Sequence, residues 1–165
     1  MFTKTRIAAA AAAFLFATPL FAEGIMVHDP YARVSAMKST SGAAFMMIHN
    51  ETGQADHRID AKSDVAQKVE LHTHMEDANG VMKMIHVAEG FELPEGGMIE
   101  MKRGGHHVMF LGLNQPLKHG DTVNLTLVFK NAGEVAVQVP VDLERKPMHG
   151  MMNHGQKKMD GQASD

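Results

Sequence analysis

Histidine and methionine recur together at alternate positions in two stretches of the chain, residues 69–87 and 104–113. The sequence contains no cysteine, so neither stretch can offer a thiolate ligand. Imidazole and thioether groups bind soft transition-metal ions, and copper is the first candidate for a thiol-free set of such ligands. The two stretches therefore predict a copper site.

The first stretch contains two runs of alternating residues separated by Asn79-Gly80, which indicates a β-hairpin. A loop with an odd number of residues places Leu71 on the same face as Val81 and Ile85, so that each run has one apolar face. In that register the polar face of the hairpin collects the candidate ligands of both runs, which are His72, His74, Met82, Met84 and His86.

The second stretch is expected to form a third strand. His107 and Met109 are two residues apart and point to one face, whereas Val108 and Phe110 point to the other. Alternate side chains on a strand are about 6.5–7 Å apart, which is close enough for both to bind one ion. One His and one Met of the hairpin, together with this His-x-Met pair, would make a four-ligand site.

The fold that must position these ligands is predicted to be all-β, with no helix beyond the N-terminal segment. Short alternating runs separated by turn residues are typical of an antiparallel sandwich or barrel. A kink is expected at Asp29-Pro30, because proline cannot donate a hydrogen bond to a neighbouring strand. The expected strands are residues 25–28, 31–34, 43–49, 57–61, 69–75, 81–87, 98–101, 107–113, 122–130 and 135–141.

The two ends of the chain differ from this central part. Residues 1–22 combine Lys4 and Arg6 with an apolar run and end in Ala22, which indicates a signal peptide and a periplasmic protein. A retained membrane anchor is the alternative. Residues 23–143 are expected to form one copper-binding β-sandwich domain, and residues 144–165 a disordered tail. The metal-binding side chains of the tail are Met148, His149, Met151, Met152, His154 and Met159.

Composition excludes several classes of function. A formal net charge of −3 without a concentrated basic face argues against nucleic acid as a partner. No second apolar run is long enough for stable membrane insertion. The absence of cysteine excludes disulfides, thiol redox chemistry and a blue-copper centre. The sequence shows no nucleophile constellation or cofactor-binding loop, so we expect a monomeric copper carrier rather than an oxidase or a reductase.

Three motifs, Val69–His72, Gly80–Met84 and Gly104–Met109, resemble the periplasmic copper chaperone family PCu(A)C, and the similarity extends over residues 27–141. The resemblance implies a cupredoxin-like β-sandwich that holds Cu(I) with two Met and two His. The ligands carried over by motif are His72, Met84, His107 and Met109. The residues that could support or replace them are His74, Met75, Met82, His86 and His106.

The same resemblance implies a physiological role, the delivery of copper to the Cu(A) site of cytochrome c oxidase. The implied partners are the Cu(A) subunit and a Sco-like assembly factor, and copper storage or resistance with the same ligands is the alternative. The His-containing tail is expected to bind Cu(II), which favours nitrogen and oxygen ligands. The remaining histidines, His28, His49, His57 and His119, are expected at the surface. Five further methionines are expected to pack in or against the core: Met26, Met46, Met47, Met98 and Met101.

Overall fold

The computed structural model describes residues 24–36, 38–57 and 59–146, and the regular structure of these residues is all β-strand. The strands are β1 (Ile25–Val34), β2 (Ser41–Asn50), β3 (Asp56–His57), β4 (Ile59–Lys62), β5 (Ala66–Glu76), β6 (Met82–His86), β7 (Glu92–Leu93), β8 (Met98–Met101), β9 (His107–Leu113), β10 (Thr122–Phe129) and β11 (Gly133–Pro140).

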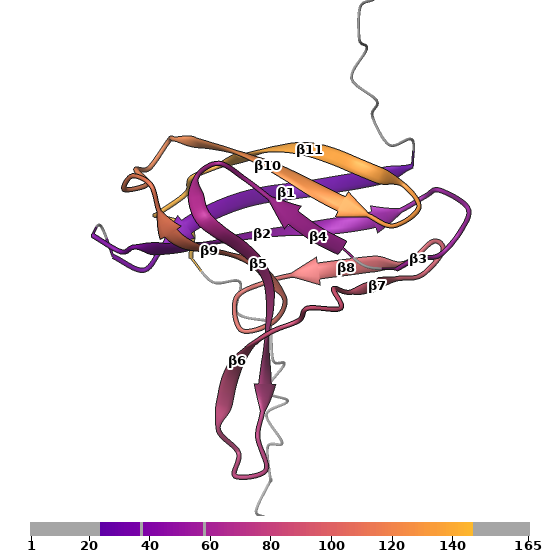
Figure 1. Ribbon diagram of the computed structural model, residues 1–165, viewed down its shortest axis with the longest axis horizontal. Coiled ribbons are helices and arrows are strands. Elements are labelled where there is room, and N and C mark those ends of the chain that lie inside the picture. Colours follow the sequence, from indigo (N-terminus) through magenta and orange to yellow (C-terminus); the bar gives the residue numbers. More distant parts are fainter. Residues whose placement is uncertain (1–23, 37, 58, 147–165) are drawn as a thin grey trace, which may run out of the picture.

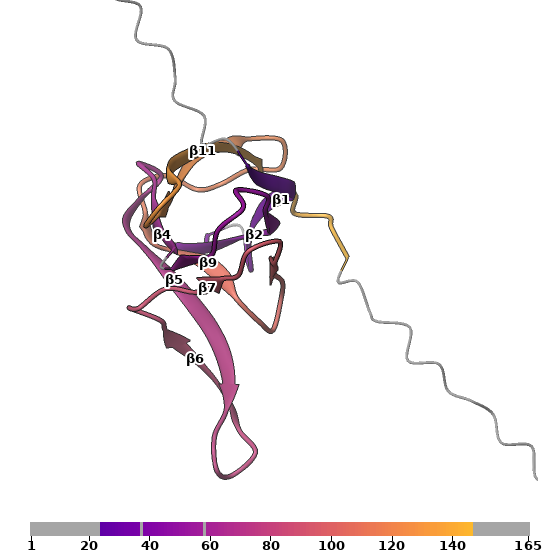
Figure 2. The same cartoon turned by 90° about the vertical axis from the view of Figure 1, so that its right-hand side faces the viewer.

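The strands form two facing sheets and a small separate pair (Figures 1 and 2). The larger sheet has the order β1-β2-β9-β5-β6, and β8 also pairs with β2. The smaller sheet has the order β11-β10-β4, and β3 pairs with β7. All these named strand pairs are antiparallel. The predicted cupredoxin-like antiparallel β-sandwich is confirmed.

The alternating pattern of the sequence determines which faces of the two sheets meet. In β10, Leu125 and Leu127 are at most 1% exposed, and Val108 and Phe110 of β9 are fully buried. Burial of apolar area contributes about 25 cal/mol per Å² to stability, so these side chains hold both strands in one orientation. Because strand residues alternate, burial of Phe110 places Met109 on the outer face of the larger sheet.

The predicted kink in β1 is present. The pairing of β1 with β2 shifts register between His28 and Tyr31, and Asp29 has a φ of 50°. Pro30 has no N–H to donate, and aspartate tolerates the left-handed conformation better than most residues. After the kink, the Tyr31 ring stacks on that of Phe45 with a centroid distance of 5.1 Å.

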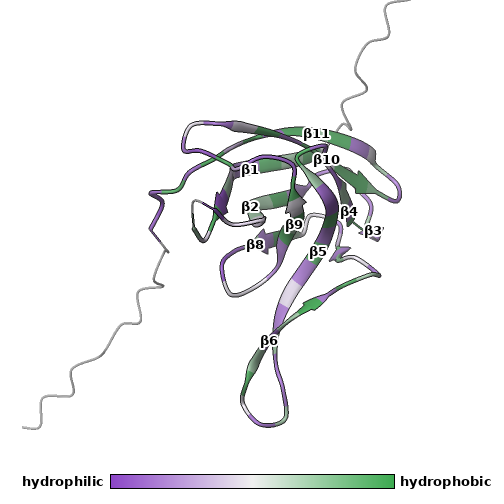
Figure 3. Ribbon diagram, turned by 60° about the vertical axis from the view of Figure 1, so that its left-hand side comes forward, coloured by the Kyte–Doolittle hydropathy of each residue, from purple (hydrophilic) through white to green (hydrophobic). Residues whose placement is uncertain are grey.

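The β5–β6 hairpin extends beyond the sandwich. β5 pairs with β9 from Ala66 to His72 and with β6 from His72 to Glu76, so its second half belongs to a two-stranded ribbon. Figure 1 shows this ribbon projecting from the two sheets, and Figure 3 shows hydrophilic and hydrophobic residues interspersed along it.

The predicted register of the hairpin is confirmed. His74 pairs with Met84, which places both side chains on one face. The expectation that the apolar side chains of the second run lie on a core face is wrong for Val81 and Ile85, which are 52% and 38% exposed. The reason is that these residues belong to the projecting ribbon and not to the sandwich.

The methionines outside the predicted site divide between core and surface. Met46 and Met101 are buried in the core as predicted. Met26, Met47 and Met98 are exposed, which contradicts their expected packing. The register of the strands accounts for this, because the neighbours Ile48 and Ile99 point inward.

The predicted signal peptide, residues 1–22, lies outside the described residues, as do all six side chains of the tail that were predicted to bind metal. Within the described residues, no helix is long and apolar enough to cross a membrane.

Candidate metal centre

The candidate ligands meet where the hairpin leaves the sandwich. His72 is the last residue of β5 that pairs with β9, where it lies opposite His107, and the first that pairs with β6. Met109 is two residues along β9 from His107 and shares its face. Two residue pairs further along the ribbon, Met84 lies opposite His74. Three strands therefore bring two His-Met pairs to a single junction.

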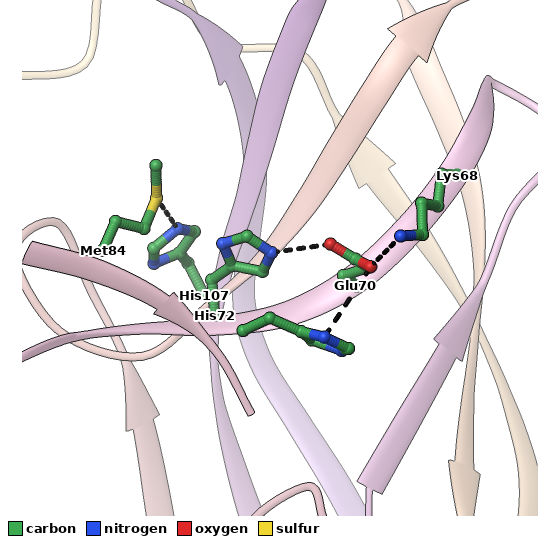
Figure 4. A network of polar contacts seen from close by, with 6 residues as sticks. Lys68, Glu70, His72, Met84 and His107 are labelled. Carbon is green, nitrogen blue, oxygen red and sulfur yellow. Dashed lines mark hydrogen bonds and ion pairs between the residues drawn. The ribbon is translucent and has the colours of Figure 1, made fainter. Parts of the chain in front are cut away.

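His107 presents an unprotonated nitrogen to a thioether. Its Nδ1 lies 2.9 Å from the carbonyl oxygen of Gly105, and because a carbonyl can only accept, Nδ1 carries the proton. The pKa of the imidazole is lowered, chiefly by burial, so the ring is neutral and Nε2 keeps its lone pair. Nε2 faces Sδ of Met84 at 3.1 Å (Figure 4). Two electron-pair donors thus point at one another.

His72 is oriented by a buried carboxylate. Its Nε2 lies 2.9 Å from Oε2 of Glu70, which is 8% exposed. The carboxylate can only accept, so Nε2 donates, and in the neutral tautomer Nδ1 keeps its lone pair. Nδ1 is buried and has no hydrogen-bond partner among the described residues. Leaving a buried polar atom unpaired costs about 1–3 kcal/mol, whereas coordination to a metal ion would satisfy this atom.

Glu70 connects the site to its surroundings (Figure 4). Its Oε1 lies 2.5 Å from Nζ of Lys68 and 3.8 Å from Nδ1 of His86. The hydrogen bond from Lys68, followed by the one from His72, lowers the pKa of the Glu70 carboxyl from 4.5 to about 2. No role was predicted for Glu70 from the sequence. The available signal was its position two residues before His72, on the same face of the strand.

An open cavity of about 490 Å³ adjoins the junction. Met84, His107 and Met109 contribute to its lining, whereas His72 does not and is held against Glu70 instead. Arg33 and Arg103 also line the cavity. Their positive charges oppose the approach of a cation, so affinity for a metal ion must come from ligand chemistry rather than from the local electrostatic potential. Within the described residues, no group of three or more His, Asp or Glu side chains is placed to hold a metal ion.

The other candidate ligands differ in their position relative to this cavity. His74 lines the cavity, and its ring centroid lies 5.4 Å from that of His107, so it stays an alternative ligand. Met75 is 55% exposed and belongs to the opposite face of the hairpin, opposite Lys83. Met82 shares the face of Met84 but lies further out on the ribbon, where it is 54% exposed.

Two further histidines lie beside the junction without pointing into its cavity. His86 pairs with His72 and joins the Glu70 network, with the two imidazole centroids 5.6 Å apart. His106 packs on Phe91 at 4.2 Å, and burial lowers its pKa. Neither histidine contributes to the lining of the cavity that contains His107.

Comparison with known proteins places the chain among relatives of the same size. A family described as "Putative lipoprotein LpqE-like" matches residues 25–141. A related protein, "Putative lipoprotein Lxx21020" of Leifsonia xyli subsp. xyli (strain CTCB07), is 30% identical over 120 residues, which are 73% of this chain and 70% of the relative.

Solved structures share the fold. The copper-bound PCuAC domain from PmoF2 is 24% identical, with a TM-score of 0.59 over 73% of this chain and 93% of that domain. The solution structure of apo-DR1885 from Deinococcus radiodurans is 26% identical, with a TM-score of 0.56 over 89% of this chain and 97% of that protein. The Cu(I) form of DR1885 is 29% identical, with a TM-score of 0.55 over 74% and 83% of the two chains.

These likenesses confirm the predicted resemblance to PCu(A)C proteins. The family match covers most of the chain and agrees with the relative that is 30% identical. The chain belongs to the LpqE-like family.

Proposed function

We propose that the chain is a periplasmic copper chaperone that binds Cu(I) through His72, Met84, His107 and Met109. The observation that carries this proposal is the 3.1 Å contact between Nε2 of His107 and Sδ of Met84, with no proton available to join them. At bond lengths like those of protein zinc sites, about 2.0 Å to nitrogen and about 2.3 Å to sulfur, one ion could bind both atoms. The flexible Met84 side chain needs little movement to accommodate it.

The oxidation state follows from the softness of the ligands. Two thioethers with two neutral imidazoles favour Cu(I) over Zn(II) or Cu(II). Solved relatives support the choice of metal, since the PmoF2 domain is described as copper-bound and DR1885 as its Cu(I) form. His74 is the alternative to His72, because it lines the same cavity. The buried, unpartnered Nδ1 of His72 and the carboxylate behind its ring favour His72.

Accessibility favours a carrier over an enzyme. Met84 is 47% exposed on a projecting hairpin, so a partner protein could reach the ion and replace this ligand first. A redox enzyme would need an open coordination position beside a substrate pocket with acid or base groups. The ionisable groups that line this cavity, apart from the histidines, are Arg33 and Arg103, and neither is a general acid or base at neutral pH.

We further propose that residues 23–143 are the working domain, that residues 1–22 direct export to the periplasm, and that the chain acts as a monomer. The lipoprotein names of the family and of the relative support a location in the cell envelope. The sequence contains no cysteine, so a cysteine-linked lipid has no attachment point within these 165 residues.

The proposed recipients are the Cu(A) subunit of cytochrome c oxidase and a Sco-like assembly factor. Copper storage or resistance is the second candidate, because the same exposed site could retain copper. Mixing the Cu(I)-loaded chain with an isolated apo Cu(A) domain distinguishes them. Appearance of the Cu(A) absorption after oxidation supports delivery, whereas retention of copper by the chain supports storage.

The proposed role of residues 144–165 is to capture Cu(II) near the Cu(I) site. The start of this segment lies beside β1, because Arg145 forms an ion pair with Asp29 and its guanidinium lies 4.1 Å from the Tyr31 ring centroid. Tyr31 stacks on Phe45, and the Phe45 ring centroid lies 6.0 Å from that of His107. A random coil of about twenty residues spans roughly 25 Å, so the length of this segment is sufficient to reach the cavity.

The test of the Cu(I) site uses two methionines of one strand. Met84→Leu removes the proposed sulfur ligand, and Met82→Leu makes the same change two residues away on the same face. We expect Met84→Leu to weaken Cu(I) binding at least tenfold in a competition assay with a chromogenic chelator, and Met82→Leu to leave it unchanged. X-ray absorption of the wild-type Cu(I) form should show nitrogen and sulfur neighbours. A shell of nitrogen and oxygen alone would rule out the site.

A further inference from the structure

The exposed methionines in the described part of the chain form two groups of three. Met75, Met82 and Met84 lie on the hairpin, and the second group lies on three other strands. Its members are Met26 on β1, Met47 on β2 and Met98 on β8. We propose that two methionines of this second group, Met26 and Met98, form a separate Cu(I) site together with His49. The inference goes beyond the proposed function because it uses none of the residues of the first site.

The strand register places the three ligands in one row. His49 of β2 pairs with Met26 of β1 on one side and with Met98 of β8 on the other. Residues directly opposite each other on antiparallel strands have Cβ atoms about 4.5–5.5 Å apart, which long side chains easily span. All three point to the outer face of the sheet, because the adjacent Ile48 and Ile99 are buried.

A second row lies beside the first. Met47 of β2 pairs with His28 of β1 and with Glu100 of β8. These residues are two positions from the first row on their own strands, about 6.5–7 Å away, and point to the same face. A thioether and an imidazole are therefore available as a fourth ligand.

His49 is oriented by a carboxylate, as His72 is. Its Nδ1 lies 3.2 Å from Oε1 of Glu51, which shares its face of the sheet. The carboxylate therefore faces the Nδ1 side of the ring, so Nε2 is the nitrogen left for a metal ion. In the first site Glu70 binds Nε2 of His72, so the two imidazoles would use opposite nitrogens for the same purpose.

The three side chains are accessible to an ion from solution. Met26 is 45% and Met98 is 59% exposed, and the His49 side chain is 37% exposed. Two thioethers and one imidazole form a soft ligand set that favours Cu(I) over Zn(II). The row shares a sheet face with the first site, since Phe45, two residues before Met47 in β2, contacts the His107 ring. Both ions would thus be reached from one side of the molecule.

The experiment follows each methionine separately. The full chain is labelled with ¹³C at the methionine methyl groups and titrated anaerobically with Cu(I), and each signal is assigned by a Met→Leu substitution. We expect the Met26 and Met98 signals to shift together and to saturate at one equivalent of their own. They should do so even in a His107→Ala, Met84→Leu background that lacks the first site. Zn(II) should leave both signals unmoved.

Substitutions test the ligand set. Met26→Leu with Met98→Leu should remove one bound Cu(I), and His49→Ala should weaken binding at this row at least tenfold. The matched control is Met46→Leu with Met101→Leu, which deletes two sulfurs from β2 and β8 on the buried face. Thermal melting checks that each variant folds. Met26 and Met98 signals that stay unmoved at Cu(I) saturation of the other methionines, or that respond equally to Zn(II), would overturn the inference. Shifts at this row without shifts at Met84 would instead refute only the proposed first site.

Discussion

Replacing Glu70 with glutamine would remove the charge behind His72 while keeping the size of the side chain. Glutamine can accept one hydrogen bond from Nε2 of His72, but it presents an amide in place of the second carboxylate oxygen. That second oxygen now binds Lys68 at 2.5 Å and lies 3.8 Å from His86. The substitution therefore weakens the interaction that orients the His72 ring, and it opens no cavity.

Copper affinity should fall because a carboxylate behind a ligating histidine fixes its tautomer and increases its basicity. Loss of such a partner typically weakens metal binding about 10–100-fold. We expect a decrease of this size for Cu(I) at neutral pH in Glu70→Gln. The control is Glu76→Gln, which removes the same charge further along β5 on the same face, where the side chain is exposed.

The stabilisation that the Glu70 charge provides should decrease as the pH falls. The pKa of Glu70 falls from 4.5 to about 2 on folding, which corresponds to about 3 kcal/mol at neutral pH. The largest cause is Lys68, whose side chain is 67% exposed, so screening reduces the expected contribution to about 1–2 kcal/mol. Because the pKa is lower in the folded chain, this stabilisation is complete above about pH 4.5 and is lost as the pH falls toward about 2.

Urea denaturation of the copper-free wild type and of Glu70→Gln, repeated between pH 2 and pH 7, measures this contribution. The difference in free energy of unfolding should be greatest at neutral pH and should nearly vanish at pH 2. A difference that does not change with pH would refute the role of the Glu70 charge. Equal Cu(I) affinity of Glu70→Gln and wild type would refute the claim that this carboxylate positions His72.

Three other changes have defined outcomes. Met109→Leu keeps the volume and apolarity of the side chain, so melting of the copper-free chain should change little, while competition with a Cu(I) chelator should show at least tenfold weaker binding. Leu125→Ala, at a position 1% exposed, should lower the urea-measured free energy of unfolding by about 2–5 kcal/mol, and a loss below 1 kcal/mol would contradict the core assignment. Truncation after Lys146 keeps the ion pair of Arg145 with Asp29. The truncated chain should bind one Cu(II) equivalent fewer in a calorimetric titration, and its Cu(I) binding should be unchanged. Unchanged Cu(II) stoichiometry would contradict a metal-binding tail.

The all-β fold and the hairpin register could be predicted because both depend on local alternation. Val123, Leu125 and Leu127 mark the inner face of β10 with a period of two. A shift of one residue in the hairpin would have moved His74 and Met84 to different faces, so the pattern excludes such a register. The His107-x-Met109 pair likewise needs only strand geometry to share a face.

Other features depend on which distant strands become neighbours, and only packing of the whole core decides this. The sequence does not show that β5 leaves the sandwich at His72, and so it could not show that Val81 and Ile85 would be exposed. Nor could the sequence show that His106 packs on Phe91, because that contact joins residues of different segments.

The sequence by itself determined the chemistry of this protein: soft, cysteine-free ligands at alternate positions on strands. The tertiary structure alone decided which of those ligands meet. Met26, His49 and Met98 carry no joint signal in the sequence, and they form one row because β1 and β8 both pair with β2. The physical reason is that alternation specifies the face of each side chain, whereas burial of the shared core selects the neighbouring strand.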